Sequence, residues 1–307
     1  MSKNNIENDE KSFPKVRLNW YPGHMAKTRK QIMQDLKLVD IVIELLDARI
    51  PISSQNPDMA EITKGKKKVI ILNKCDLADE NQNKLWVEYF NQKGITAILT
   101  DSNSGKGIEE SIRQIEKVME DSMKVQVDKG RIGRKIRAMI LGIPNVGKSS
   151  YINRISKRTT AGVGNKPGVT RQKQWIRINE KVELLDTPGV LWPKFESEEV
   201  ALHLAFTGTI KEDILERTEI AYYLVKFLLE NNMKQLCERY KIDKTYIEQT
   251  LEQERPENEN IYEIMLEIGR KRGCIISGGN IDEEKTARII LDEFKNGKLG
   301  RITIEKV

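Results

Sequence analysis

The sequence predicts an α/β fold, a doubly wound and mostly parallel sheet, followed by a smaller all-α domain. Over residues 19–197, short apolar segments alternate with amphipathic helical patterns, which is typical of parallel strands joined by crossover helices. From about residue 198 to 307, long helical patterns replace this alternation, and only the last residues suggest another strand. A chain of 307 residues has room for two domains of ordinary size.

The elements of the first domain follow in order along the chain. Apolar residues at helical spacing over 25–39 predict a helix, and a further helix is expected around 79–93. Ile108 to Met119 has the spacing of an amphipathic helix, and one more helix is expected from Lys148. The expected strands are "DIVIELLD" (40–47), "KVIILN" (68–73), "ITAILT" (95–100), "AMILG" (138–142), and "QWIRIN" and "VELLD", which form a hairpin turning at 179–180.

Composition narrows the class of protein. Apolar residues make up 38% of the chain and charged residues 32%, a soluble globular balance, and no apolar run approaches the ~20 residues that span a bilayer. Residues 1–18 contain no apolar targeting segment and are expected to be a disordered tail. Three scattered cysteines have no metal or disulfide spacing, so we expect a cytoplasmic protein with no membrane attachment.

Basic residues are clustered more than the net charge of +6 suggests. The clusters lie at 64–68, 129–137, 269–273 and 295–301. Such patches favour a polyanionic partner, either nucleic acid or a ribonucleoprotein, because binding releases counterions. The alternative is that each run is a solvated face.

The segment "GIPNVGKS" (142–149) has the spacing G-x-x-x-x-G-K-S of a loop that binds phosphates. Its backbone N–H groups turn towards a phosphate, Lys148 reaches the β and γ phosphates, and Ser149 ligates Mg²⁺. The apolar segment before it and the helical pattern after it argue against a chance glycine loop. The nucleotide contacts expected from this loop are those of Asn145, Val146, Gly147, Lys148, Ser149 and Ser150.

A second motif, "LLDTPG" (184–189), places Asp186 at the end of a strand. A carboxylate there can hold Mg²⁺, and the backbone N–H of Gly189 can donate to the γ-phosphate. By itself the motif is also compatible with a simple turn.

A third motif, "NKCD" (73–76), selects the base. The carboxylate of Asp76 can accept from N1–H and the N2 amine of guanine, whereas adenine has no donor at either place. Asn73 is expected at the other edge of the purine, and the stem of Lys74 along its plane. Four residues alone are a weak signal, but together with the other two motifs they predict a guanine-nucleotide site.

Two loops are weaker candidates. "TDSNSGKG" (100–107) follows a strand and can supply donors to guanine O6 around Ser102 and Asn103. "GNKPGVTRQ" (164–172) contains Thr170, which can cap Mg²⁺ and the γ-phosphate, or it is an ordinary linker.

Taken together, these motifs resemble the circularly permuted GTPases of the ribosome biogenesis GTPase A (RbgA/YlqF) family. The matching segments also include "NWYPGHMAK", "LLDARIPISSQNP", "IGRKRGCIISGG" and "GKLGR", and they cover most of the chain. The resemblance implies a cytoplasmic protein that binds GTP and GDP and acts late in assembly of the large ribosomal subunit. It also implies that the helical domain contacts ribosomal RNA.

The base motif precedes the phosphate loop, the reverse of the usual GTPase order, and we interpret this as a circular permutation. The sheet can stay unchanged, because the ends of such a domain lie close together. Segment 118–135 is then the new connection. The chain leaves the domain just after Gly189, so that a change in the γ-phosphate loop can act directly on the helical domain.

The catalytic group is less obvious than the binding groups. Lys148 and Gly189 can stabilise charge on the γ-phosphate, but Val190 occupies the position where many GTPases place a glutamine that orients water. The resemblance implicates His24, whose imidazole can position water. Its alternative roles are RNA contact or packing. His203 is expected to pack or to lie on a helix surface.

Asn145 admits two roles. The resemblance suggests a ligand for K⁺ that supplies positive charge to the reaction, and the alternative is that Asn145 only shapes its loop.

The sequence thus favours a Mg²⁺-dependent GTPase, monomeric off the ribosome, whose partner is a precursor of the large ribosomal subunit and its RNA. A slow binding switch that acts as a checkpoint is the main alternative. An RNA-modifying enzyme lacks a visible second site, and a phosphotransferase would leave the guanine motif unexplained.

Overall fold

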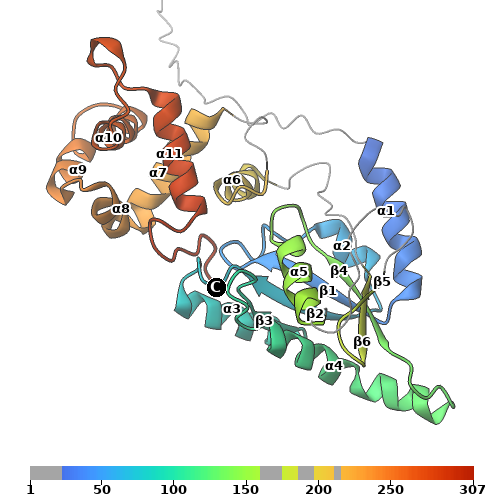
Figure 1. The fold of residues 1–307 in the computed structure, drawn as a ribbon. Helices are drawn as coiled ribbons and strands as arrows, with labels where there is room; N and C mark the ends of the chain where they lie inside the picture. Colours follow the sequence, from blue (N-terminus) through green and yellow to red (C-terminus); the bar gives the residue numbers. More distant parts are fainter. Residues whose placement is uncertain (1–22, 160–174, 186–196, 211–215) are drawn as a thin grey trace, which may run out of the picture.

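The computed structural model of the chain describes residues 23–159, 175–185, 197–210 and 216–307 (Figure 1). Within them lies a six-stranded sheet of order β3-β2-β1-β4-β6-β5. All neighbouring strands are parallel except β5 and β6, which form the expected antiparallel hairpin. The predicted doubly wound sheet is therefore confirmed, and its strands are β1 (Ile41–Asp47), β2 (Lys67–Asn73), β3 (Thr96–Leu99), β4 (Ile136–Leu141), β5 (Trp175–Arg177) and β6 (Val182–Leu185).

Helices cover both faces of this sheet. Successive side chains of β1 point to opposite faces, and since they are mostly apolar on both, each face is packed against helices. Ile43 and its neighbours at every second position pack against α4 and α5, whereas Val42 and Leu46 face α1, α2 and α3. All three of these side chains are at most 1% exposed. The bounds of the helices are α1 (Gly23–Asp35), α2 (Pro57–Ile62), α3 (Glu80–Gln92), α4 (Ile108–Asp128) and α5 (Lys148–Thr159), with the 3₁₀ helix η1 (Leu36–Leu38) after α1.

The predicted connection over 118–135 is helical over 118–128, beyond the end expected for the preceding helix. Helix α4 continues to Asp128, because apolar residues keep their helical spacing through Met119, which is 3% exposed, and Met123, which packs against the core. Only residues 129–135 link α4 to β4.

The C-terminal part is helical, as expected. Helix α7 packs against α10 and α11, and their buried residues, such as Leu224, Ile264 and Ile290, form a core that is continuous with the α4 side of the sheet. Among the described residues, no helix is both long and apolar enough to cross a bilayer. The bounds are α6 (Glu198–Phe206), α7 (Arg217–Asn231), α8 (Met233–Tyr240), α9 (Lys244–Leu251), α10 (Glu257–Lys271), η3 (Ser277–Gly279) and α11 (Glu283–Lys295).

The last residues of the chain return to the sheet, where Figure 1 shows the C-terminus beside α3. The N–H of Ile302 donates to the carbonyl of Leu77 at 3.0 Å, and the N–H of Ile304 donates to the carbonyl of Arg49 at 2.9 Å. The expected strand at this end of the chain does not form. Residues 301–307 bond to loop carbonyls rather than to a strand edge, so no ladder is made.

The side chain of Glu305 fastens this tail. Its carboxylate accepts from the N–H groups of Ile52 at 2.6 Å and Ser53 at 2.9 Å, and lies 3.2 Å from Nδ1 of His203. His203 is thus packed at the junction between α6 and the tail, with a side chain 13% exposed, which agrees with the role expected for it.

Replacing Glu305 by alanine removes the acceptor of the partly buried N–H of Ser53 and of the exposed N–H of Ile52. The free energy of unfolding is expected to fall by about 1–3 kcal/mol, as for other unsatisfied buried donors. Urea unfolding followed by circular dichroism measures the change. Lys306→Ala, which removes an exposed side chain from the neighbouring position, serves as the control and should change stability by less than about 0.5 kcal/mol. Equal effects of the two variants would contradict the role given to Glu305.

Candidate functional site: a nucleotide pocket at the strand ends

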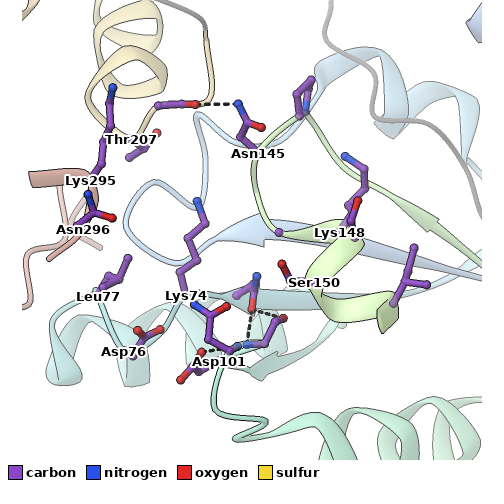
Figure 2. A pocket seen from close by; sticks show the side chains of 18 residues that line it. Lys74, Asp76, Leu77, Asp101, Asn145, Lys148, Ser150, Thr207, Lys295 and Asn296 are labelled. Atoms are coloured by element: carbon purple, nitrogen blue, oxygen red, sulfur yellow. Dashed lines mark hydrogen bonds between the residues drawn. The ribbon is translucent and has the colours of Figure 1, made fainter. Parts of the chain in front are cut away.

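A pocket of about 1210 Å³ lies beyond the carboxyl ends of β2, β3 and β4 (Figure 2). The strand order places β2 and β3 on one side of β1, and β4 and β6 on its other side. Ligands of doubly wound sheets bind at such a reversal. The base motif and the phosphate loop, which are far apart in the sequence, line the same pocket.

The phosphate loop fits tightly into this end of the sheet. A Cβ on Gly142 would lie 2.6 Å from the carbonyl oxygen of Leu45, and one on Gly147 would lie 2.3 Å from Nδ2 of Asn73. Gly147 also has φ of +100°, a conformation that L side chains rarely adopt. Both glycines of the motif are therefore required by close backbone approach.

Three residues of the loop reach the pocket from the start of α5. Lys148, Ser149 and Ser150 line it, and Nζ of Lys148 donates to the carbonyls of Gly142 at 2.8 Å and Ile143 at 2.6 Å. The ammonium group is thus held over the loop in which phosphates are expected. The side chain of Val146, in contrast, is fully buried in the core, so that only its backbone can serve a nucleotide.

The side chain of Asn73 ties three loops together. Its Nδ2 donates to the carbonyl of Val146 at 2.8 Å, and its Oδ1 accepts from the hydroxyls of Thr100 at 3.1 Å and Ser102 at 2.7 Å. The asparagine is 2% exposed. It therefore joins the base motif to the phosphate loop and to the loop after β3. Its expected contact with the purine edge stays a prediction.

Lys74 and Asp76 lie at one end of the pocket, away from Lys148 (Figure 2). Desolvation, followed by the nearby carboxylate of Asp101, raises the pKa of Asp76. Since only the ionised carboxylate accepts two hydrogen bonds from guanine, acidification removes this acceptor earlier than it would at an ordinary aspartate.

The loop after β3 is held against α5. Arg154 donates from Nε to the carbonyl of Ser102 at 3.2 Å and also bonds to the carbonyl of Asn103. The N–H of Asn103 donates to the carboxylate of Asp101 at 2.8 Å. Both Ser102 and Asn103 line the pocket, and their donation to guanine O6 stays a prediction. The clamp by Arg154 was not visible in the sequence.

Beneath the base motif lies a buried carboxylate, Asp47, at the end of β1. It is 0% exposed, accepts from Nε and Nη2 of Arg49 at 3.0 and 2.8 Å, and lies 3.0 Å from Nζ of Lys74. Burial alone would raise the pKa of Asp47, but the two cations outweigh it and hold this pKa well below its usual range. The stem of Lys74 is thereby fixed along one side of the pocket.

The C-terminal part also contributes to the pocket, which the sequence did not reveal. Thr207 and Gly208, after α6, and Lys295 and Asn296, at the end of α11, line it together with the motifs. Nδ2 of Asn145 donates to the carbonyl of Gly208 at 2.9 Å. Lys295 and Asn296 stood out only as part of a basic cluster.

Backbone strain is concentrated at the same place. Lys74 and Asn145 have φ of 58° and 59°, and Lys241 at the end of α8 is the remaining non-glycine residue with positive φ in the described part of the chain. Conformations of this kind cost about 1–3 kcal/mol and persist where the surroundings enforce them, often in ligand sites.

Four predicted site residues cannot be placed in the pocket. Thr170, Asp186 and Gly189 lie outside the described residues. The backbone of His24 is in the first turn of α1, and its side chain lies outside the described part.

Comparison with known proteins gives consistent results. A family model for the "50S ribosome-binding GTPase" matches residues 137–265, starting at β4 and leaving the earlier base motif outside. Ribosome biogenesis GTPase A of Bacillus cereus is 44% identical over 288 residues, which cover 94% of this chain and 93% of that protein. The protein of the same name from Bacillus pumilus is 44% identical and covers 94% and 98%.

The structure of GNP-bound YlqF from T. maritima superposes with a TM-score of 0.60 at 28% identity, covering 91% of this chain and 98% of that one. A GDP-bound YlqF structure matches with the same TM-score. Guanine nucleotides are thus bound by structures of this fold. By its sequence identity along almost the whole length and by its permuted motifs, this chain belongs to the ribosome biogenesis GTPase A family and is a GTPase.

Proposed function

We propose that this protein hydrolyses GTP while bound to a precursor of the large ribosomal subunit and so promotes a late step of its maturation in the cytoplasm. The observation that carries the proposal is the meeting of three loops in one pocket. Asn73 joins the guanine motif to the phosphate loop through a bond of 2.8 Å and to the loop of Ser102 through one of 2.7 Å. The names of the relatives and of the matched family support the ribosomal partner.

Mg²⁺ is the expected companion of the nucleotide. Ser149 lines the pocket at the start of α5, where a hydroxyl can ligate a metal that neutralises the developing charge on the phosphates. We assign Thr170 and Asp186 to the same metal by their motifs. Lys148 and the backbone of Gly189 would stabilise the γ-phosphate during the reaction.

A potassium ion at Asn145 is a further part of the proposal. Nδ2 of Asn145 donates to the carbonyl of Gly208, so the side-chain oxygen is the atom that can bind a cation. The same bond also supports the alternative in which Asn145 shapes its loop, and dependence of turnover on K⁺ over Na⁺ separates the two roles.

The basic clusters differ in the partners and the exposure of their side chains. Nζ of Lys66 and of Lys67 donate to main-chain carbonyls at 2.7 and 2.6 Å, and Lys68 pairs with Glu44. At the end of α10, Arg270 and Lys271 pair with acidic residues of the same helix and remain 44% exposed. We place RNA contact first at Arg270 and Lys271, because both are 44% exposed and lie in the helical part, whose contact with RNA the family resemblance implies. The cluster at 64–68 is the alternative.

Asp76→Asn replaces a double acceptor with an amide that can donate. Preference should shift from GTP towards xanthosine triphosphate, whose C2 carbonyl accepts, and the ratio of the two dissociation constants should change by ~10⁴. Both constants are measured by calorimetry. Asp101→Asn, at a carboxylate that lines the same pocket, is the control and should keep the preference for GTP. A wild-type ratio in Asp76→Asn would show that Asp76 does not read the base.

His24→Ala should lower kcat by about 10² while leaving the affinity for GTP nearly unchanged, because the imidazole acts on water in the transition state. Subunit-stimulated single-turnover hydrolysis measures the effect. The other histidine provides the control, since His203 lies outside the residues that line the pocket, and His203→Gln should keep kcat. Unchanged turnover of His24→Ala would remove this residue from the mechanism. Weaker binding of the ribosomal subunit with unchanged kcat would instead assign His24 to contact with the subunit.

Arg270→Gln combined with Lys271→Gln should weaken subunit binding and flatten its salt dependence, by a slope of about 0.9 for each RNA phosphate that the protein no longer neutralises. Arg272 is kept, because it pairs with Glu293 at 3.0 Å and stacks on Tyr240, so its removal would disturb packing. Lys244→Gln removes an exposed, carboxylate-paired lysine of α9 and is the matched control. GTP binding and basal hydrolysis should persist, and an unaltered salt slope would mean that the cluster is a solvated face.

The main alternative is a binding switch with little turnover, and comparison of hydrolysis with and without subunits decides between them. The monomeric state off the ribosome is also a proposal, which sedimentation tests directly.

A further inference from the structure

The end of α11 is built into the wall of the nucleotide pocket. Lys295 and Asn296 line the side of the pocket that also holds Lys74, Asp76 and Leu77, away from Lys148, and the side chain of Lys295 extends from there along Gly208 towards Thr207 (Figure 2). By the base motif, this end is where guanosine rather than the phosphates would sit. An ammonium group and a side-chain amide are suited to hydrogen-bond the oxygens of a ribose.

We propose that Lys295 and Asn296 bind the guanosine part of the nucleotide, so that GTP or GDP connects the C-terminal helices to the base-reading loop. This inference rests on the proposed nucleotide site, and it adds two binding residues from a part of the chain that contains no nucleotide motif.

Close packing fixes the end of α11 against the base-reading loop. A Cβ on Gly297, which has φ of +68°, would lie 2.7 Å from Cδ2 of Leu77. The stem of Lys295 lies against Gly208, where a Cβ would come within 3.1 Å of its Cδ. Glycine at 297 lets the end of α11 approach a side chain of the base-reading loop, and glycine at 208 leaves room within the C-terminal part for the stem of Lys295. Lys295 and Asn296 thereby reach the pocket.

Polar contacts of Arg49 also hold the end of α11 against the base-reading loop. Nη1 of Arg49 donates to the carbonyl of Lys295 at 3.3 Å, and the guanidinium lies 6.0 Å from the centre of the Phe294 ring. The same guanidinium binds Asp47, which also holds Lys74. One buried ion pair thus positions both the lysine of the base motif and the end of α11.

A second connection reaches the pocket from the phosphate loop. Asn145 donates to the carbonyl of Gly208, against which the stem of Lys295 packs. The contacts therefore form a closed ring around the pocket, from the phosphate loop through α6 and α11 to Arg49, Asp47 and the base motif. A nucleotide inside this ring touches both parts of the chain, and its binding stabilises their docking.

The first experiment compares Lys295→Met, which keeps the stem and removes the charge, with Asn296→Ala. Dissociation constants of GTP, GDP and GMP are measured by competition against fluorescent GDP. The affinity of each variant should fall about tenfold, and by the same factor for all three nucleotides, because guanosine is common to them. Lys298→Met, which removes an exposed lysine outside the pocket, is the control and should bind as the wild type does.

Two results would overturn the inference. Unchanged affinities would mean that Lys295 and Asn296 only border the pocket. A loss of affinity that grows with the number of phosphates would assign Lys295 to the phosphates instead of guanosine. Asp76→Asn is measured in the same assay. If the proposed nucleotide site is right, the GTP affinity of Asp76→Asn falls even when the Lys295 and Asn296 variants give one of these two results, so failure of this inference is distinguished from failure of the site.

A second experiment tests the docking itself. Gly297→Ala pushes a Cβ against Leu77 and should weaken GDP binding several-fold without touching the nucleotide. Gly300→Ala carries the same kind of positive-φ strain, at φ of +98°, but its Cβ would meet nothing within 4 Å. GDP affinity should therefore fall in Gly297→Ala and not in Gly300→Ala. Equal affinities in the two variants, with both folded by circular dichroism, would contradict a role of α11 docking in nucleotide binding.

Discussion

The carboxylate of Asp47 is buried between two cations, and the geometry of the pocket depends on it. A buried charge without its partners costs several kcal/mol, so Arg49 and Lys74 are both held in place, at 2.8 and 3.0 Å. Asp47 ends β1, and its partners come from the loop that follows β1, through Arg49, and from the end of the neighbouring strand β2, through Lys74. Through Lys74 it orients the base motif, and through Arg49 it anchors the end of α11. Such a buried ion pair fixes the positions of Lys74 and Arg49 and need not add to the net stability of the fold.

The permuted order of the chain explains why the end of α11 lies near Asp47 and Arg49. The chain enters the C-terminal helices after β6, on one side of the sheet, and returns through residues 299–307 to the loops after β1 and β2 on the other. The helical part is therefore fastened at the α6 end by Asn145 and Gly208, and at the tail by Glu305. In the proposed function the helical part contacts the ribosomal subunit. Two attachments on opposite sides of the pocket would then let nucleotide binding and subunit binding influence each other.

Much of the fold and the site was predictable from local pattern. The strands ending at Asp47 and Asn73, the hairpin before Leu185, and the helix beginning at Lys148 follow from apolar periodicity and from glycine placement, which act over a few residues. Errors arose where periodicity alone was ambiguous. Helix α4 outlasted its expected end because Met123 still packs against the core, and the tail at Ile302 looked like a strand because a short apolar segment carries no information about its partner.

The sequence by itself predicted the chemistry of the site, because the phosphate loop and the guanine motif are short segments whose residue types and spacing are typical of the ligand groups expected there. It also indicated the permutation, through their order. Only the tertiary structure decided that Asn73 joins three loops and that Lys295 and Asn296 line the pocket. Contacts between residues so far apart in the chain arise from the packing of whole elements, from the approach of Gly297 to Leu77 and from one shared carboxylate, and no local spacing records them.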